Sequence, residues 1–574
     1  MLAALALLAA IPLFAQTESD AQALMRSGKI DEAIGVYAAL ARQSPRTPKY
    51  EDQIGFLLAA TKRVSEALPH FRRATEIDPR YAPAFYHEGV ALWLNHQPEP
   101  AISALRKAVE LAPDSAEYLW RLGSALLESG DYRAAATELS ESVKRNPANG
   151  PAWQSLGMAQ QQVQDFAAAR DAYAKALELD PANAGLRNSY GFMLVNTREA
   201  DAGIAQFESI LSKNPDDTAA QVNIGFAYLQ KGELDKAIRQ LSAVIAAHPD
   251  LAVAHYDLGL ALKQKDDLSS AASELHRALA LDSRMVEAHY TLGIIAWQNG
   301  DIEQTVAEMK TATTASPDYA QAWYMLGTAL KQKRDLSGAV ASLKKAIDLD
   351  PANAGLRNSY GFMLVNTRQA DAGIAQFEGI LSKNPDDTAA QVNIGFAYLQ
   401  KGELDKAIRH LSAVIAVHPD LAVAHYDLGL ALKQKDDLSS AASELHRALA
   451  LDSRMVEAHY TLGIIAWQNG DIEQTVAEMK TATTASPDYA QAWYMLGAAL
   501  KQQRDLSGAV ASLKKAIDLD GTDPGPYNTL GLVLRQQGDN EAAKEAFAKA
   551  AAIKTAAEKH QAELLQRGPA RGLR

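Results

Sequence analysis

Two kinds of side chain in this sequence could do chemistry by their type and spacing. His255 and His289 stand 34 residues apart, and imidazoles at matched positions can ligate a metal ion. The adjacent acids Asp216 and Asp217 could exchange protons with a substrate. No third ligand accompanies the histidines, and an acidic pair in a turn is explained by helix capping. We therefore interpret both features as structural and expect no catalytic residue and no metal site.

The composition excludes several further classes of function. Nucleophile elbows, phosphate-binding loops and zinc-binding helices are absent from the sequence. The formal net charge of −12 argues against nucleic acid as a partner, because phosphate recognition needs a basic surface. With no cysteine, the chain can form neither disulfides nor a lipid attachment at an N-terminal cysteine. The sequence predicts a non-enzymatic protein without cofactors.

The elements that would position these residues are repeated. The stretch "DPANAGLRNSYGFMLVNTR" begins at Asp180 and again, unchanged, at Asp350, which is 170 residues later. Residues 180–349 and 350–519 form a tandem duplication with six substitutions, and only Thr328/Ala498 among them is expected to touch a binding surface. Because 170 is five times 34, each block holds five copies of a shorter unit.

The 34-residue unit is clearest from Ala320, taken as position 1. Apolar residues recur every three or four positions, first around Trp323 and then around Leu343, which predicts two amphipathic helices. Glycine at position 15, as in Gly232, suits the end of the first helix, and proline at position 32 closes the unit. Small residues at positions 8 and 20 are expected to let the helices of one unit and the next approach closely. Glu88, where leucine is expected, has no explanation in the sequence.

The register holds for sixteen units, the first of them truncated, from about Thr17 to about Ala557. This pattern resembles the tetratricopeptide repeat family. The resemblance implies an all-α fold, a right-handed superhelical solenoid of about sixteen helix-turn-helix repeats over residues 16–555, followed by a C-terminal capping helix and short basic tail over residues 556–574.

Residues 1–15 are apolar and resemble the hydrophobic region of a secretory signal peptide. They are too short to span a bilayer comfortably. We expect an exported protein, periplasmic or extracellular, and a cytoplasmic one if the signal is not functional. A misassigned start codon or a short anchor is the alternative.

The resemblance also implies that positions 2, 5, 9, 12 and 13 of the first helices line a concave groove. Regularly spaced aromatic rings favour binding, because they offer rigid contact area at small entropic cost. The alternative is that the rings fill gaps between neighbouring first helices. The candidate ligand-binding groove residues are Tyr86, Trp93, Tyr256, Lys263, Tyr290, Ile294, Trp297, Tyr324, Lys331, Tyr426, Lys433, Tyr460, Ile464, Trp467, Tyr494 and Lys501.

Three interpretations of function follow. The first is an envelope scaffold that holds extended or helical segments of partner proteins in the groove. The second is an assembly or secretion factor for exported polysaccharide or outer-membrane proteins. The third is a regulatory subunit of a separately encoded enzyme. The duplication predicts two nearly identical binding surfaces and hence a bivalent scaffold, unless it is a recent event without functional consequence.

Overall fold

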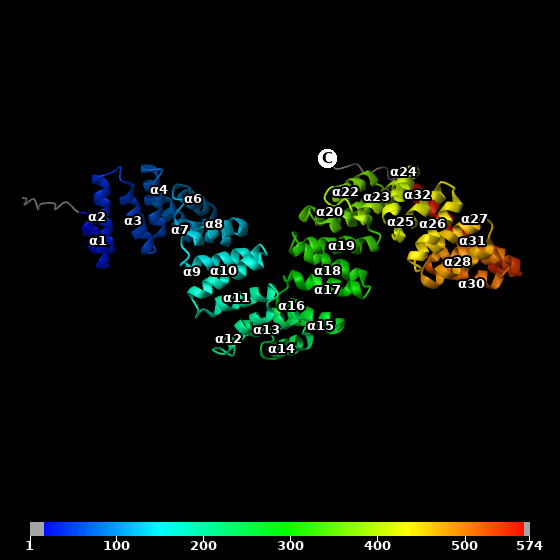
Figure 1. The fold of residues 1–574 in the computed structure, drawn as a ribbon, viewed down its shortest axis with the longest axis horizontal. Helices are drawn as coiled ribbons and strands as arrows, with labels where there is room; N and C mark the ends of the chain where they lie inside the picture. The colour runs from blue at the N-terminus through cyan, green and yellow to red at the C-terminus, as the bar shows by residue number, and fades with distance from the viewer. Residues whose placement is uncertain (1–16, 567–574) are drawn as a thin grey trace, which may run out of the picture. The chain divides into compact units, whose positions relative to one another are not determined.

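The computed structural model describes residues 17–566, with side chains up to residue 559, in two units, residues 17–291 and 292–566. Helices follow one another in chain order within each unit, and the described residues contain no strand (Figure 1). The expected segment 1–15 lies outside the described residues.

The first unit contains sixteen helices and the start of a seventeenth, α17, in which the unit boundary falls. They are α1 (Glu18–Arg26), α2 (Ile30–Gln43), α3 (Pro48–Ala60), α4 (Val64–Ile77), α5 (Ala82–Leu94), α6 (Pro98–Leu111), α7 (Ala116–Glu128), α8 (Tyr132–Arg145), α9 (Gly150–Gln162), α10 (Phe166–Leu179), α11 (Ala184–Asn196), α12 (Ala200–Leu211), α13 (Thr218–Gln230), α14 (Leu234–Ala247), α15 (Ala252–Gln264), α16 (Leu268–Leu281) and α17 (Val286–Gln298).

The second unit continues with α18 (Ile302–Ala315), α19 (Ala320–Gln332), α20 (Leu336–Leu349), α21 (Ala354–Asn366), α22 (Ala370–Leu381), α23 (Thr388–Gln400), α24 (Leu404–Val417), α25 (Ala422–Gln434), α26 (Leu438–Leu451), α27 (Val456–Gln468), α28 (Ile472–Ala485), α29 (Ala490–Gln502), α30 (Leu506–Leu519), α31 (Pro524–Gln537) and α32 (Asn540–Gln566). Within each unit, odd-numbered helices pack against the even-numbered helices that follow them. The predicted all-α solenoid of about sixteen helix pairs is confirmed.

The glycine at position 8 allows close packing inside one helix pair, not between successive pairs as the sequence suggested. A Cβ atom added to Gly89 on α5 would lie 2.6 Å from the Cγ of Leu105 and 3.1 Å from the carbonyl oxygen of Ala101, both on α6. Leu105 is fully buried. The absence of a side chain at position 8 therefore sets how closely the first and second helices of a unit approach.

The turn after each first helix has a left-handed residue at position 15. Gly232 has a φ of 74°, as expected for glycine. Nine residues other than glycine also adopt a positive φ at this position among the described residues, for example Arg368 at 63°. The turn geometry is therefore set by the packing of the two helices, and the local residue type follows it only in part.

In several repeats the side chain at position 4 connects the first helix to the preceding loop. In Trp153, Arg187, Gln221, His255 and Trp323, a side-chain nitrogen lies 2.8 to 3.1 Å from the carbonyl oxygen of the proline six residues earlier. These groups differ in shape and charge, but each can donate an N–H to the carbonyl. Position 4 therefore supplies a hydrogen-bond donor as well as packing.

Asp217 caps the N-terminus of α13, and a contact of Glu88 accounts for its charge. The carboxylate of Asp217 accepts a hydrogen bond from the backbone N–H of Ala220 at 3.0 Å, so the predicted capping role is confirmed. Glu88, unexplained by the sequence, accepts from the Nε of Arg72 at 3.2 Å. The carboxylate at this position therefore pairs α5 with α4, the second helix of the preceding repeat.

The expected C-terminal cap is continuous with α32, which runs from Asn540 to Gln566. The cap side chains Ala562, Leu564 and Leu565 and the end of the tail lie outside the residues whose side chains are described. Among the described helices, none is both long and apolar enough to cross a lipid bilayer.

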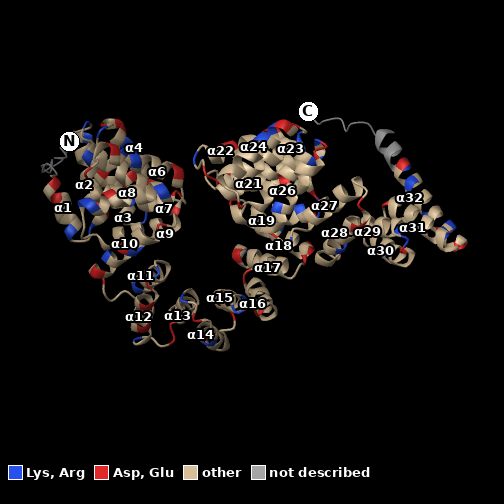
Figure 2. Ribbon diagram, turned by 45° about the vertical axis from the view of Figure 1, so that its right-hand side comes forward, with Lys and Arg blue, Asp and Glu red and all other residues tan. Residues whose placement is uncertain are grey.

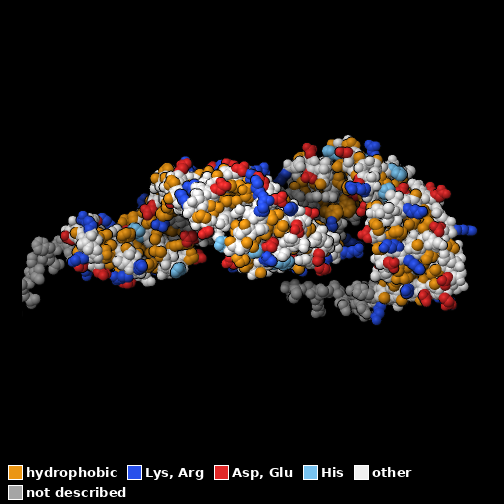
Figure 3. All heavy atoms as spheres, turned by 90° about the horizontal axis from the view of Figure 1, so that it is seen from below, with side chains coloured by type: hydrophobic (Ala, Val, Ile, Leu, Met, Phe, Trp, Pro, Cys, Tyr) orange, Lys and Arg blue, Asp and Glu red, His pale blue; other side chains and the backbone are white. Residues whose placement is uncertain are grey.

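Acidic and basic residues are interspersed along the helices (Figure 2). On the face that Figure 3 shows, hydrophobic side chains lie scattered among charged ones. Charge alone therefore does not mark one binding surface, and the site has to be found from local geometry.

Candidate functional site

The predicted rings at position 5 lie at contacts between successive first helices. Tyr86 on α5 is only 8% exposed; its hydroxyl donates to the Glu117 carboxylate at 2.7 Å, and its ring stacks on Tyr118 with 4.5 Å between centroids. Tyr256 on α15 is half-buried, with a hydrogen bond to Thr291. Burial raises the pKa of Tyr86 and of Tyr256 to about 12. The burial of the Tyr86 ring between α5 and α7 agrees, for this residue, with the alternative that the rings fill gaps between neighbouring first helices.

The other predicted residues lie on first helices of their own units. In the first unit, Lys263 and Tyr290 are half-buried. In the second, Lys331 is exposed and its Nζ lies 4.9 Å above the ring of Phe362. The half-buried members of the second unit are Ile294, Trp297, Tyr324, Tyr426, Lys433, Tyr460, Ile464, Trp467, Tyr494 and Lys501. Their partial burial leaves part of each side chain available to a partner.

Three adjoining cavities follow α5 from its middle to its C-terminal end. Their volumes are about 460, 100 and 700 Å³. Val90 lines the first two cavities, Trp93 the second and third, and Leu94 all three. The structure therefore places the predicted groove residue Trp93 in a continuous row of hollows in the first unit.

The first cavity has an apolar floor and a fixed imidazole. His87 lines it, and the Nδ1 of His87 lies 2.7 Å from the Oδ1 of Asp52, which is 1% exposed. Asp52 thus holds the ring of His87 in place beside the cavity. Burial, and to a smaller extent the nearby Asp52 carboxylate, raises the pKa of Tyr81 to about 12. The lining contains no serine, cysteine or lysine, so this arrangement favours hydrogen bonding to a ligand over covalent catalysis.

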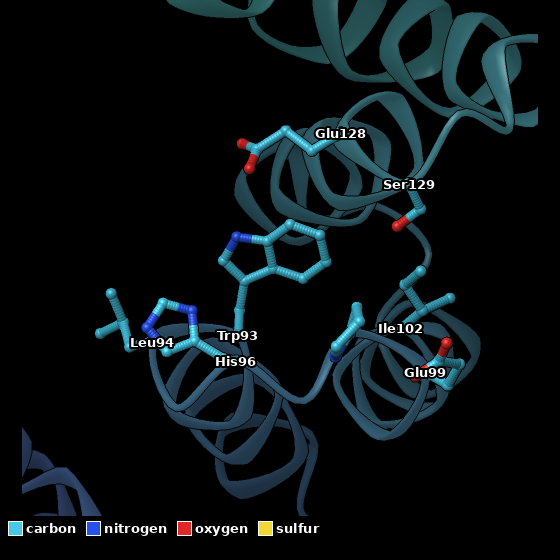
Figure 4. A pocket seen from close by; sticks show the side chains of 8 residues that line it. Trp93, Leu94, His96, Glu99, Ile102, Glu128 and Ser129 are labelled. Carbon is cyan, nitrogen blue, oxygen red and sulfur yellow. The ribbon is translucent and has the colours of Figure 1, made fainter.

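The largest of the three cavities is built around Trp93. Figure 4 shows the indole rising from α5 toward Glu128 on α7, with Ile102 and Glu99 on α6 at its other side. His96, from the turn between α5 and α6, completes one edge. An aromatic face, an aliphatic wall and two carboxylates therefore surround one hollow.

The histidine at position 4 is structural. The Nδ1 of His255 lies 2.6 Å from the Glu274 carboxylate and its Nε2 lies 3.1 Å from the Pro249 carbonyl oxygen, so both ring nitrogens have partners. Among the side chains that the structure describes, no group of three possible metal ligands comes together. His255 therefore connects α15 to α16 and to the loop that precedes α15.

Sequence reasoning missed most residues that line these cavities. Phe56, at position 9 of its unit, and Leu94, at position 13, are 42% and 59% exposed. The groove positions used for the later repeats would have identified both. Glu128 also stands at position 13 of its unit, so the same pattern would have identified it. Glu99 falls outside that pattern, because it lies on the second helix of its unit.

Protein families match the chain along most of its length. Four families described as tetratricopeptide repeat match residues 20–82, 53–116, 256–304, 426–474 and 460–524 (the first), 92–160 and 195–259 (the second), 150–183 (the third) and 525–556 (the fourth). Residues 307–422 match the cytochrome c-type biogenesis protein H TPR domain. The search of curated proteins gave no match.

Several solved structures are similar to the chain. The structure of Naa15/Naa10 bound to HypK-THB is 14% identical, with a TM-score of 0.32, and the match covers 94% of this chain and 93% of that one. Yeast Tom70 is 17% identical, with a TM-score of 0.35, and coverage is 74% and 97%. MamA is 24% identical, with a TM-score of 0.28, and coverage is 29% and 97%.

The paired helices, the 34-residue register and the family matches from residue 20 to residue 556 agree with one another. This chain belongs to the tetratricopeptide repeat family.

Proposed function

We propose that this protein is a non-enzymatic scaffold of the cell envelope that holds segments of partner proteins against its first helices. The observation that carries the proposal is the row of cavities along α5, bordered by the exposed side chains of Phe56 and Leu94. Removing such apolar surface from water under a partner favours association. A row of hollows that follows α5 to its C-terminal end suits an extended or helical segment.

Selection of random peptides displayed on phage against the full-length chain tests this proposal. We expect enriched peptides that bind the unmodified protein and lose affinity for a Phe56→Ser/Leu94→Ser variant. A Leu179→Ser/Leu281→Ser variant, which changes exposed apolar side chains on second helices of the first unit, is the matched control. Failure to enrich any peptide that distinguishes the two variants would contradict groove binding.

A second candidate is an assembly or secretion factor for exported molecules. The match of residues 307–422 to the TPR domain of a cytochrome c-type biogenesis protein favours it, because that name describes an assembly role. Deleting the gene should then lower the abundance of exported proteins or polysaccharide in the envelope. Stoichiometric copurification with a catalytic chain would instead favour the third interpretation, a regulatory subunit.

Export through residues 1–15 is part of the proposal. The apolar composition of this segment supports it. We expect the protein to fractionate with the periplasm or medium of its natural host, and N-terminal sequencing to begin near Gln16. Recovery of the intact N-terminus in the cytoplasm would contradict export.

Bivalent binding is the last part of the proposal, and the near-identity of residues 180–349 and 350–519 supports it. Titration calorimetry with a peptide that carries one copy of the segment bound by these blocks should give two binding sites per chain. Tyr460→Ala/Trp467→Ala should reduce the number to one. A single site in the unmodified chain would contradict bivalence.

A further inference from the structure

We propose that the cavity beside Trp93 takes a lysine or arginine side chain of the bound partner segment, an inference that rests on the proposed function. The cavity has a volume of about 700 Å³, which is ample for one long side chain. It lies at the C-terminal end of α5, where the row of hollows ends.

The walls suit the aliphatic part of a basic side chain. Leu94, Pro98 and Ile102 contribute apolar surface beside the indole of Trp93. Lysine and arginine bury their methylene groups along such surfaces while the charged end stays hydrated. The face of an indole also attracts a cation, and tryptophan is the strongest of the aromatic residues in this respect.

The charge of the lining favours a cation. Glu99 and Glu128 are exposed, and neither forms an ion pair or hydrogen bond with any residue whose side chain the structure describes. In Figure 4 their side chains stand on opposite sides of the indole. A basic group above the ring can therefore meet a carboxylate on either side, and the lining contains no lysine or arginine.

The nearest arginine does not neutralise this cavity. Arg121 lines the two neighbouring cavities but not this one. Its guanidinium carbon lies 4.3 Å from the centroid of the Trp120 ring, so its charge is held over a different aromatic face. An acidic partner side chain would meet two unpaired carboxylates beside Trp93, which disfavours it.

The distance between this cavity and the cavity lined by His87 predicts how far apart two side chains of the partner segment should be. His87 in that cavity precedes Trp93, which lines the largest cavity, by six residues on α5, which is about 9 Å at 1.5 Å per residue. An extended peptide advances about 3.3 Å per residue, so about three residues separate side chains that enter the two hollows. The expected pattern in the partner is a large apolar residue and a basic residue about three positions apart.

The peptide selection described above tests this inference when it is repeated with a Glu99→Gln/Glu128→Gln variant. We expect enriched peptides to contain lysine or arginine about three residues from an apolar residue. Their affinity for the variant should fall about tenfold, as should that of a peptide with its basic residue changed to glutamine. Combining the two changes should cost little more than either alone.

A Glu208→Gln/Glu378→Gln variant changes the same number of exposed glutamates on second helices and should leave binding unchanged. Groove-dependent peptides that lack a basic residue, or that bind the Glu99→Gln/Glu128→Gln variant equally well, would overturn the inference and leave the proposed function standing. If no groove-dependent peptide is enriched, both are overturned.

Discussion

The buried carboxyl of Asp257 should make the stability of the first unit fall as the pH rises. Asp257 lies on α15, is 5% exposed and has no hydrogen-bond partner among the described residues. Burial raises its pKa to about 7, and it does the same to Asp427 at the matching position of the second block. A buried charge without a partner is unfavourable, so the protonated form is preferred in the folded protein.

The magnitude follows from the pKa in the two states. The folded pKa of Asp257 is about 7, whereas an unfolded aspartate titrates near 3.9. The folded chain binds this proton more tightly, so its stability is highest below about pH 4 and decreases as the pH rises to about 7. The difference corresponds to about 4 kcal/mol at one site. Asp257→Asn removes this titration, so the variant should lack that part of the pH dependence.

Hydrogen exchange of peptides from α15 at pH 5 and pH 8, corrected for intrinsic exchange rates, measures the effect locally, because repeat arrays can unfold in parts. Raising the pH should weaken protection of α15 more in the unmodified protein than in Asp257→Asn. Asp250→Asn, in the exposed loop before α15, is the matched control. Equal pH dependence in the unmodified protein and Asp257→Asn would refute the reasoning.

Three further changes test the packing. Gly225→Ala should destabilise by about 1 to 3 kcal/mol in urea denaturation, because the new Cβ would lie 2.6 Å from the buried Leu241 side chain; unchanged stability would contradict this packing. Arg368→Gly should raise the melting temperature and stabilise by up to about 1 kcal/mol, since it relieves a positive φ; a lower melting temperature would show that the side chain contributes more. Trp323→Phe should cost about 1 kcal/mol by removing the donor to Pro317, whereas Trp323→His should retain part of it, and equal melting temperatures would exclude such a role for the donor.

The sequence predicted the helix pairs and their register because both follow from periodic apolar residues. It predicted correctly that glycine at position 15 ends the first helix. It did not predict that residues such as Arg368 adopt a positive φ at the same position, since helix packing imposes that turn. It identified His255 as structural without its partner Glu274, which lies 19 residues later on the facing helix. The cavities could not be predicted, because a hollow depends on how neighbouring side chains fill space. The burial of Tyr86 could not be predicted either, because the ring that stacks on it, Tyr118, belongs to the next repeat.

The hydrogen bond made by position 4 has a consequence for how such repeats diverge. Tryptophan, arginine, glutamine and histidine all reach the same carbonyl, as in Trp153, Arg187, Gln221 and His255. Natural selection at this position can therefore act on the capacity to donate a hydrogen bond to the preceding loop, while the aromatic character of the residue changes freely. Substitution tables that treat these four residues as dissimilar therefore underestimate the similarity of neighbouring repeats. Sequence searches that score donor capacity at position 4 should recover diverged units that a tryptophan consensus overlooks.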